Sequence, residues 1–71
     1  MAMKTKESIY KIIGKNVRLF RKKERMTLND LSKKTGISTS FLSNIENGSK
    51  QATLLTLEKI ATALKINLTS L

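Results

Sequence analysis

The sequence predicts an all-α fold, a compact bundle of four to five helices. Apolar residues recur at the spacings of three and four that place them on one side of a helix. The chain also lacks proline, and no stretch alternates apolar and polar residues as a half-buried strand does. Its 71 residues, of which 39% are hydrophobic, allow one domain with one small core.

The first helix is expected to follow a short polar segment. We expect residues 1–7 to form a flexible tail and residues 8–71 to form the domain. An apolar stripe then recurs at spacings of four, four and three: Ile9, Ile13, Val17 and Phe20. Residues 1–25 hold nine basic and two acidic side chains, so this helix also presents a strongly basic surface.

The second helix is bounded by cap residues. Thr27 with Asp30 three positions later resembles a capping box, in which each side chain satisfies a free backbone amide of the first turn. Gly36 ends the helix, because glycine enters the left-handed C-cap conformation without strain. The pattern predicts a helix over about 28–35.

Two further helices have similar boundaries. Ser38 precedes a predicted helix over about 39–47, which Gly48 ends, and Thr53 precedes the fourth helix. The fourth helix carries the apolar stripe Leu54, Leu57, Ile60, Ala61 and Leu64. Asn67 could cap a fifth turn, from Leu68 to Leu71.

Charge and composition indicate the kind of partner. Fourteen Lys and Arg against five Asp and Glu give a net charge of +9, which favours a polyanion and, first among these, nucleic acid. The chain has no Cys and no His, so we expect no metal, no cofactor and no enzymatic activity. No apolar run approaches the roughly 18 residues that span a bilayer. We therefore expect a cytoplasmic protein with no membrane partner and no small-molecule ligand.

Residues 28–46 have the pattern of a helix-turn-helix, two short helices joined by a turn that contains glycine. Ile37, Leu42 and Ile45 would hold the second of these helices against the others. Its remaining side chains are then left facing outward, where they could reach base edges in a DNA major groove about 12 Å wide. These side chains are Thr39, Ser40, Ser43 and Asn44.

From residue 9 to residue 71 the chain resembles the Xre family of DNA-binding domains, which includes lambdoid phage repressors, Cro proteins and restriction–modification controller proteins. The matching stretches are IGKNVRLFRKK, MTLNDLSKKTGISTSFLSNIENG and TLLTLEKIATALKINLTSL. The resemblance implies a lambda-repressor-like fold and a sequence-specific regulator of transcription, a repressor or an autoregulator. It also implies a homodimer that binds a palindromic operator in double-stranded DNA.

The resemblance assigns roles to residues of this chain. Base contacts would be made by Thr39, Ser40 and Asn44, while Ser43 lies where a base or a phosphate is contacted. Phosphate contacts are expected from the basic first helix and from the loop after the recognition helix: Arg18, Lys22, Asn47, Ser49 and Lys50. Arg21 and Glu46 match an ion pair. An exposed pair of this kind would contribute at most about 1 kcal/mol, whereas a part-buried pair, which we favour, would position the recognition helix.

Three positions depart from the family pattern. Leu28 replaces a glutamine that helps to hold a phosphate, so that contact is lost. Arg25 and Lys65 stand where the family has glycine at the ends of the first and fourth helices. If both residues keep a left-handed backbone, each costs about 1 kcal/mol.

An unusual leucine and the C-terminal apolar residues suggest a dimer interface. Leu55 occupies a position on the fourth helix that is usually polar in the family. With it we assign Ile66, Leu68 and Leu71 to a possible interface, although a single exposed leucine needs no special explanation. The alternative function is a protein-interaction module of the same fold, such as an antitoxin-type domain that binds a partner protein.

Overall fold

The computed structural model describes the backbone of residues 6–71 and the side chains from residue 9 onward. Its helices are α1 (Lys6–Lys23), α2 (Leu28–Thr35), α3 (Thr39–Asn47), α4 (Leu54–Ala63) and a short 3₁₀ turn, η1 (Leu68–Ser70). The described residues contain no strand. The predicted all-α bundle is therefore confirmed.

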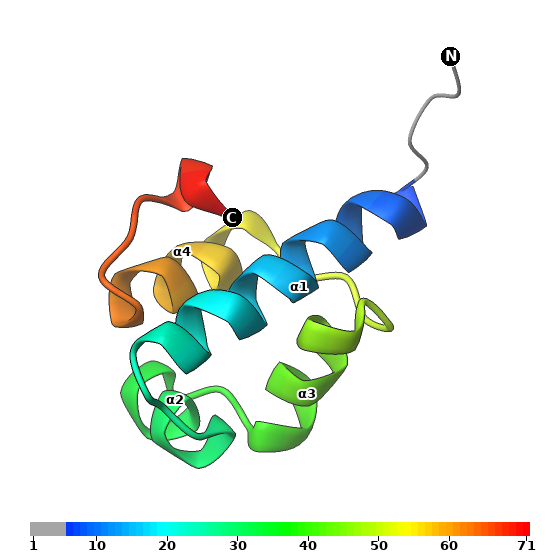
Figure 1. Ribbon diagram of the computed structural model, residues 1–71. Helices are drawn as coiled ribbons and strands as arrows, with labels where there is room; N and C mark the ends of the chain where they lie inside the picture. The colour runs from blue at the N-terminus through cyan, green and yellow to red at the C-terminus, as the bar shows by residue number, and fades with distance from the viewer. Residues whose placement is uncertain (1–5) are drawn as a thin grey trace.

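Helix α1 crosses the whole molecule, with α4 and η1 above it and α2 and α3 below it in the view of Figure 1. Helix α3 lies against α1 and α2, while α4 lies against α2 and η1. The N-terminal end of α1 extends beyond this body, as Figure 1 shows. In the helix-turn-helix formed by α2 and α3, α2 lies below the C-terminal end of α1 and α3 below its middle.

The core lies where the four helices meet. Its fully buried large side chains come from every helix or from the residue that ends one: Val17, Leu31, Leu42, Ile60 and Leu64. Burying each of these side chains contributes about 1.5–3 kcal/mol. The stripes predicted for α2 and α3 thus supply the core residues that hold α3 in place.

The predicted caps of α2 are formed. The Thr27 side chain accepts a hydrogen bond from the Asp30 amide at 3.0 Å, and the Asp30 carboxylate accepts one from the Thr27 amide at 2.9 Å. The hydrogen bond that the carboxylate accepts from the Thr27 amide, with a smaller effect of the Thr27 side chain, lowers the pKa of Asp30 below its ordinary value. Ser38 and Thr53 cap α3 and α4 in the same way, each accepting an amide hydrogen bond at 3.1 Å.

Several details differ from the sequence expectations. Helix α1 begins at Lys6, two residues inside the predicted tail, and the rest of that tail lies outside the described residues. Leu54, placed in the core stripe of α4, is 69% exposed because it lies in the first turn, beyond the edge of the core. Ile9 is 44% exposed because the first turns of α1 extend past the body. Asn67 precedes η1, but its side chain makes no capping bond.

Arg25 and Lys65 both keep the left-handed backbone of the family's glycines, with φ of 57° and 60°. The Met26 and Ile66 amides then return to the carbonyl oxygens of Arg21 and Ala61, both at 3.0 Å. The chain therefore reverses after α1 and α4 as it would at glycine, with the strain that a side chain adds there.

Candidate nucleic-acid interface

The turn between α2 and α3 is fixed by local hydrogen bonds. Gly36, with φ of 74°, donates its amide to the Ser32 carbonyl oxygen at 2.8 Å. The Thr35 hydroxyl donates to the Leu31 carbonyl oxygen at 2.8 Å and accepts from the Ile37 amide at 3.2 Å. These bonds set the direction in which the chain enters α3.

The outer surface of α3 consists of small polar side chains. Thr39 and Ser40 in its first turn are exposed, and Ser43 and Asn44 are half-buried. Leu42 and Ile45 on the opposite side are buried in the core. The four residues assigned to base contacts therefore share one accessible surface, which is free of charge.

Asn44 is joined to the loop that follows α3. The Ser49 amide donates to the Asn44 backbone carbonyl oxygen at 3.0 Å. The Ser49 hydroxyl lies 3.2 Å from the same oxygen and 3.4 Å from the Asn44 side-chain oxygen Oδ1. Ser49, which was assigned to phosphate, is thus placed to orient Asn44. Asn47 and Lys50, which precede and follow Ser49 in the sequence and were also assigned to phosphate, are exposed.

Arg21 connects three parts of the fold. Its Nε donates to Glu46 Oε2 at 2.6 Å, its Nη2 to Glu46 Oε1 at 3.0 Å, and its Nη1 to the Met26 carbonyl oxygen at 2.8 Å. The two side chains are only 11% and 6% exposed. The hydrogen bonds to Glu46, with a smaller effect from its charge, raise the pKa of Arg21 against the opposing effect of burial. This bidentate pair connects α1 to the C-terminal end of α3, and the bond to Met26 connects α1 to the turn before α2.

Two glycines allow α1 and the end of α3 to approach closely. A Cβ at Gly14 would lie 2.6 Å from the Glu46 carbonyl oxygen and also too close to that of Ile45. A Cβ at Gly48 would lie 2.8 Å from Lys11 Cα, in addition to the strain of its φ of 72°. The basic helix α1 is therefore held directly beside α3.

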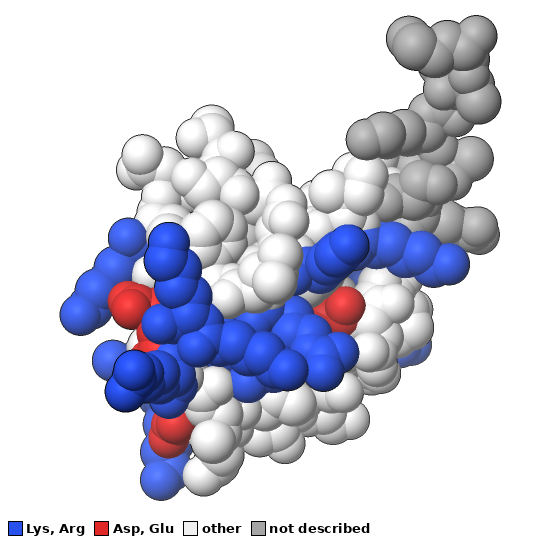
Figure 2. Space-filling view, viewed as in Figure 1, with Lys and Arg blue, Asp and Glu red and all other residues white. Residues whose placement is uncertain are grey.

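Positive charge borders this surface. Lys11, Lys15, Arg18 and Lys22 of α1 are all exposed. Figure 2 shows Lys and Arg gathered in a band that follows α1 across this face, next to a largely uncharged region. Arg18 and Lys22, assigned to phosphate contacts, lie on the accessible side of α1, whereas Arg21 turns inward to Glu46.

The residues assigned to a dimer interface fall into two groups. Leu55 is 64% exposed on α4. Ile66, Leu68 and Leu71 are half-buried and pack against the core of their own chain. These three residues therefore leave only part of their apolar surface accessible.

The fold and this surface define the class of protein, a small helix-turn-helix domain with a basic flank. The helix-turn-helix family HTH_3, a family of DNA-binding transcriptional regulators, matches residues 17–71. The chain belongs to this family. No helix among the described residues has the length and apolar character needed to cross a bilayer.

Similar sequences are regulators by name. The chain is 36% identical over 61 residues to the HTH-type transcriptional regulator SlrR of Bacillus subtilis (strain 168), covering 84% of this chain and 40% of SlrR. It is 30% identical over 57 residues to the uncharacterized HTH-type transcriptional regulator y4dJ of Sinorhizobium fredii, covering 80% of this chain and 74% of y4dJ. The chain thus spans less than half of SlrR.

Solved structures share the fold. An HTH_3 family transcriptional regulator from Vibrio cholerae superimposes with a TM-score of 0.88 at 29% identity, over 93% of this chain and 37% of that one. The restriction–modification controller protein C.AhdI from Aeromonas hydrophila gives a TM-score of 0.86 at 24% identity, over 89% of this chain and 96% of that one. The second likeness shows the fold alone.

Sequence reasoning missed two features of this site. It gave Gly14 no role, although a glycine inside a helical pattern costs about 1 kcal/mol relative to alanine and so signals close packing. It also assigned Ser49 only to phosphate and did not anticipate its bonds to Asn44. No pattern in the sequence signals the second feature, because it depends on how the loop folds back over α3.

Proposed function

We propose that this domain is a sequence-specific regulator of transcription, a repressor or an autoregulator, that reads the major groove of double-stranded DNA with α3. The observation that carries the proposal is the accessible, uncharged surface of Thr39, Ser40, Ser43 and Asn44 beside the basic face of α1. Small hydrogen-bonding side chains suit base edges, while cations suit phosphates. The protein acts in the cytoplasm as a binding protein rather than as an enzyme.

The phosphate backbones are held on both sides of α3. Arg18 and Lys22 on α1 contact one stretch of backbone, and Asn47, Ser49 and Lys50 in the loop after α3 contact another. The free amides at the start of α2 and α3 add to these contacts, since helix N-termini favour anions. Leu28 at the start of α2 offers no hydrogen bond there, so that contact depends on backbone amides alone.

Asn44 is the main source of discrimination. An asparagine amide can accept from N6 and donate to N7 of adenine at the same time, a geometry that the other bases lack. The Ser49 hydroxyl beside Asn44 Oδ1 limits the rotation of the amide before DNA arrives. Arg21 and Glu46 act on recognition without contacting DNA, because their ion pair fixes the end of α3 relative to α1.

Two copies bind one operator. Ile66, Leu68 and Leu71 at the C-terminal end of the domain form part of the contact between copies, and the two recognition helices then meet half-sites about 34 Å apart on one face of the duplex. Their remaining accessible apolar surface supports this arrangement.

The test compares two substitutions on selected and random duplexes. Lys50→Ala should weaken binding to both duplexes alike and flatten the dependence on salt, because one phosphate contact is lost. Asn44→Ala should instead lower discrimination at one base pair by about 1–3 kcal/mol. Fluorescence anisotropy at several salt concentrations measures both effects, on an operator obtained by selection from a random pool.

The outcome that contradicts the proposal is equal weakening of specific and random binding by both variants. Negligible affinity for random duplex DNA at low salt would instead favour the protein-interaction alternative, because a net charge of +9 must produce some binding if DNA is the partner.

A further inference from the structure

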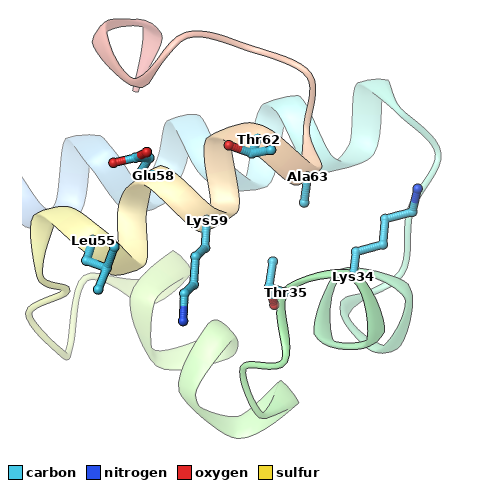
Figure 3. Close-up of a pocket in the computed structure, with 7 residues that line it drawn as sticks. All are labelled: Lys34, Thr35, Leu55, Glu58, Lys59, Thr62 and Ala63. Atoms are coloured by element: carbon cyan, nitrogen blue, oxygen red, sulfur yellow. The ribbon is translucent and has the colours of Figure 1, made fainter.

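A shallow hollow of about 330 Å³ lies between the end of α2 and the outward side of α4 (Figure 3). Two residues of α2 and five of α4 line it: Lys34, Thr35, Leu55, Glu58, Lys59, Thr62 and Ala63. None of these residues belongs to α3 or to the loop after it. The hollow is therefore separate from the surface assigned to base contacts.

One end of the hollow is apolar. Leu54 and Leu55 are 69% and 64% exposed, more than any other large hydrophobic side chain whose exposure the structure describes. The segment 51–57 that carries them contains no charged residue. Two adjacent leucines in water, of which Leu55 lines the hollow, indicate a surface that a partner covers.

A lysine flanks the hollow on each side. Lys34 comes from α2 and Lys59 from α4, and Glu58 is the one acidic residue of the lining. Figure 3 shows Lys59 next to Leu55 and Lys34 on the far side, with Thr35 and Ala63 facing one another between the two lysines, so small side chains form the floor between the charges. Within the described part of the chain, the one ion pair joins Arg21 to Glu46, so neither lysine is held in an ion pair. The charge of Lys34 also acts on Asp30 one turn earlier, whereas Lys59 is the lysine beside Leu55.

We propose that this hollow binds an acidic amphipathic helix of a partner protein. An apolar side chain of that helix packs on Leu55 and Ala63, and its carboxylates lie beside Lys34 and Lys59. Recognition of this kind uses apolar anchors on one face of the ligand helix, with flanking charges that select the partner.

Two other occupants fit the chemistry less well. DNA offers phosphates to the lysines, but its sugar–phosphate backbone has no apolar surface that could cover the exposed leucines. A second copy of this chain carries a net charge of +9, and Glu46, one of its five acidic residues, is already buried against Arg21. An acidic partner protein satisfies the leucines and the lysines together.

The probe is a fluorescein-labelled peptide of about twelve residues, three helical turns, in which leucines occupy one face and glutamates the others. Binding is measured by anisotropy with the full 71-residue chain. Amide chemical shifts of the ¹⁵N-labelled protein then locate the peptide. We expect shifts at Thr35, Leu55, Lys59 and Ala63 and none from Thr39 to Asn44.

Variants of exposed residues test the two ends separately. Leu55→Ser should weaken binding about tenfold, because the ligand's apolar side chain loses its partner. Leu19→Ser is the matched control, since Leu19 is similarly exposed at 58% but lies on α1. The double charge reversal Lys34→Glu with Lys59→Glu should abolish binding of the glutamate peptide and allow a lysine version of the peptide to bind.

Several results would overturn the proposal. One is an equal effect of Leu55→Ser and Leu19→Ser, and another is undiminished binding of a peptide whose leucines are replaced by alanine. Shifts confined to α3 would show that the peptide only mimics DNA. A fall in self-association of Leu55→Ser by sedimentation, with peptide binding unchanged, would assign the leucine to contact between two copies instead.

Discussion

Gly14→Ala separates the effect of helix propensity from that of close packing. In an exposed helix the substitution would stabilise the protein by about 1 kcal/mol, because alanine is the better helix former. Here the new Cβ would lie 2.6 Å from the Glu46 carbonyl oxygen and too close to that of Ile45, and both contacts are with backbone. Neither atom can move without shifting the end of α3.

The expected net effect is a loss of stability. Forcing an extra carbon into such a contact costs about 1–3 kcal/mol, and contacts with two backbone carbonyls place this case at the upper end. After the gain in propensity, the free energy of unfolding should fall by about 2 kcal/mol, which lowers Tm by roughly 8–16 °C in a domain of this size. Thermal unfolding followed by circular dichroism measures the change.

Gly36→Ala is the control. Gly36 has φ of 74° but no atom within 4 Å of the added carbon, so this variant suffers backbone strain without a clash. It should lose about 1 kcal/mol and leave the contact between α1 and α3 intact. The reasoning is refuted if Gly14→Ala matches or exceeds the wild-type Tm, since α1 and α3 would then have room that the geometry denies them.

Three further predictions concern the caps and the buried ion pair. Arg25→Gly and Lys65→Gly should each raise Tm by a few degrees, because relief of about 1 kcal/mol of left-handed strain exceeds the lost attraction of a cation to the helix end. Calorimetry of each variant checks this, and an unchanged or lower Tm contradicts it. Arg21→Ala should lower the free energy of unfolding by about 3 kcal/mol or more, because Glu46 stays buried without its partner. Replacing both Arg21 and Glu46 by Met should lower it less than this single change does, and urea unfolding measures both variants. Because the pKa of Asp30 is lowered in the folded state, its contribution to stability is present above the ordinary carboxyl pKa and is lost as pH falls through the folded value. The difference in unfolding free energy between wild type and Asp30→Asn should therefore shrink in acid. A difference independent of pH would show that the cap does not depend on the charge.

The boundaries of α2, α3 and α4 could be predicted from the sequence because they depend on neighbours in the chain. A cap such as Thr27 satisfies amides within three residues, and a glycine such as Gly36 ends a helix through its own backbone freedom. The left-handed backbones of Arg25 and Lys65 were raised only as a condition, through the glycines that the family has at these positions. The core position of Leu54 was predicted wrongly, because periodicity cannot tell where the neighbouring elements stop covering a helix.

The candidate site could be predicted only in part. The residues facing outward from α3 follow from periodicity, once Leu42 and Ile45 are placed inside. The contact of Ser49 with Asn44 and the close approach at Gly14 depend on where two separate segments come to rest.

The sequence by itself therefore determined the helices, their caps and the polar character of the recognition surface. The family resemblance had already paired Arg21 with Glu46, but only the tertiary structure decided that Arg21 also reaches the Met26 carbonyl oxygen, and that Lys34 and Lys59 share one hollow with Leu55. The physical reason is that local hydrogen bonds and periodicity act over a few residues, whereas the distance between side chains far apart in the chain is set by how all four helices fill one core.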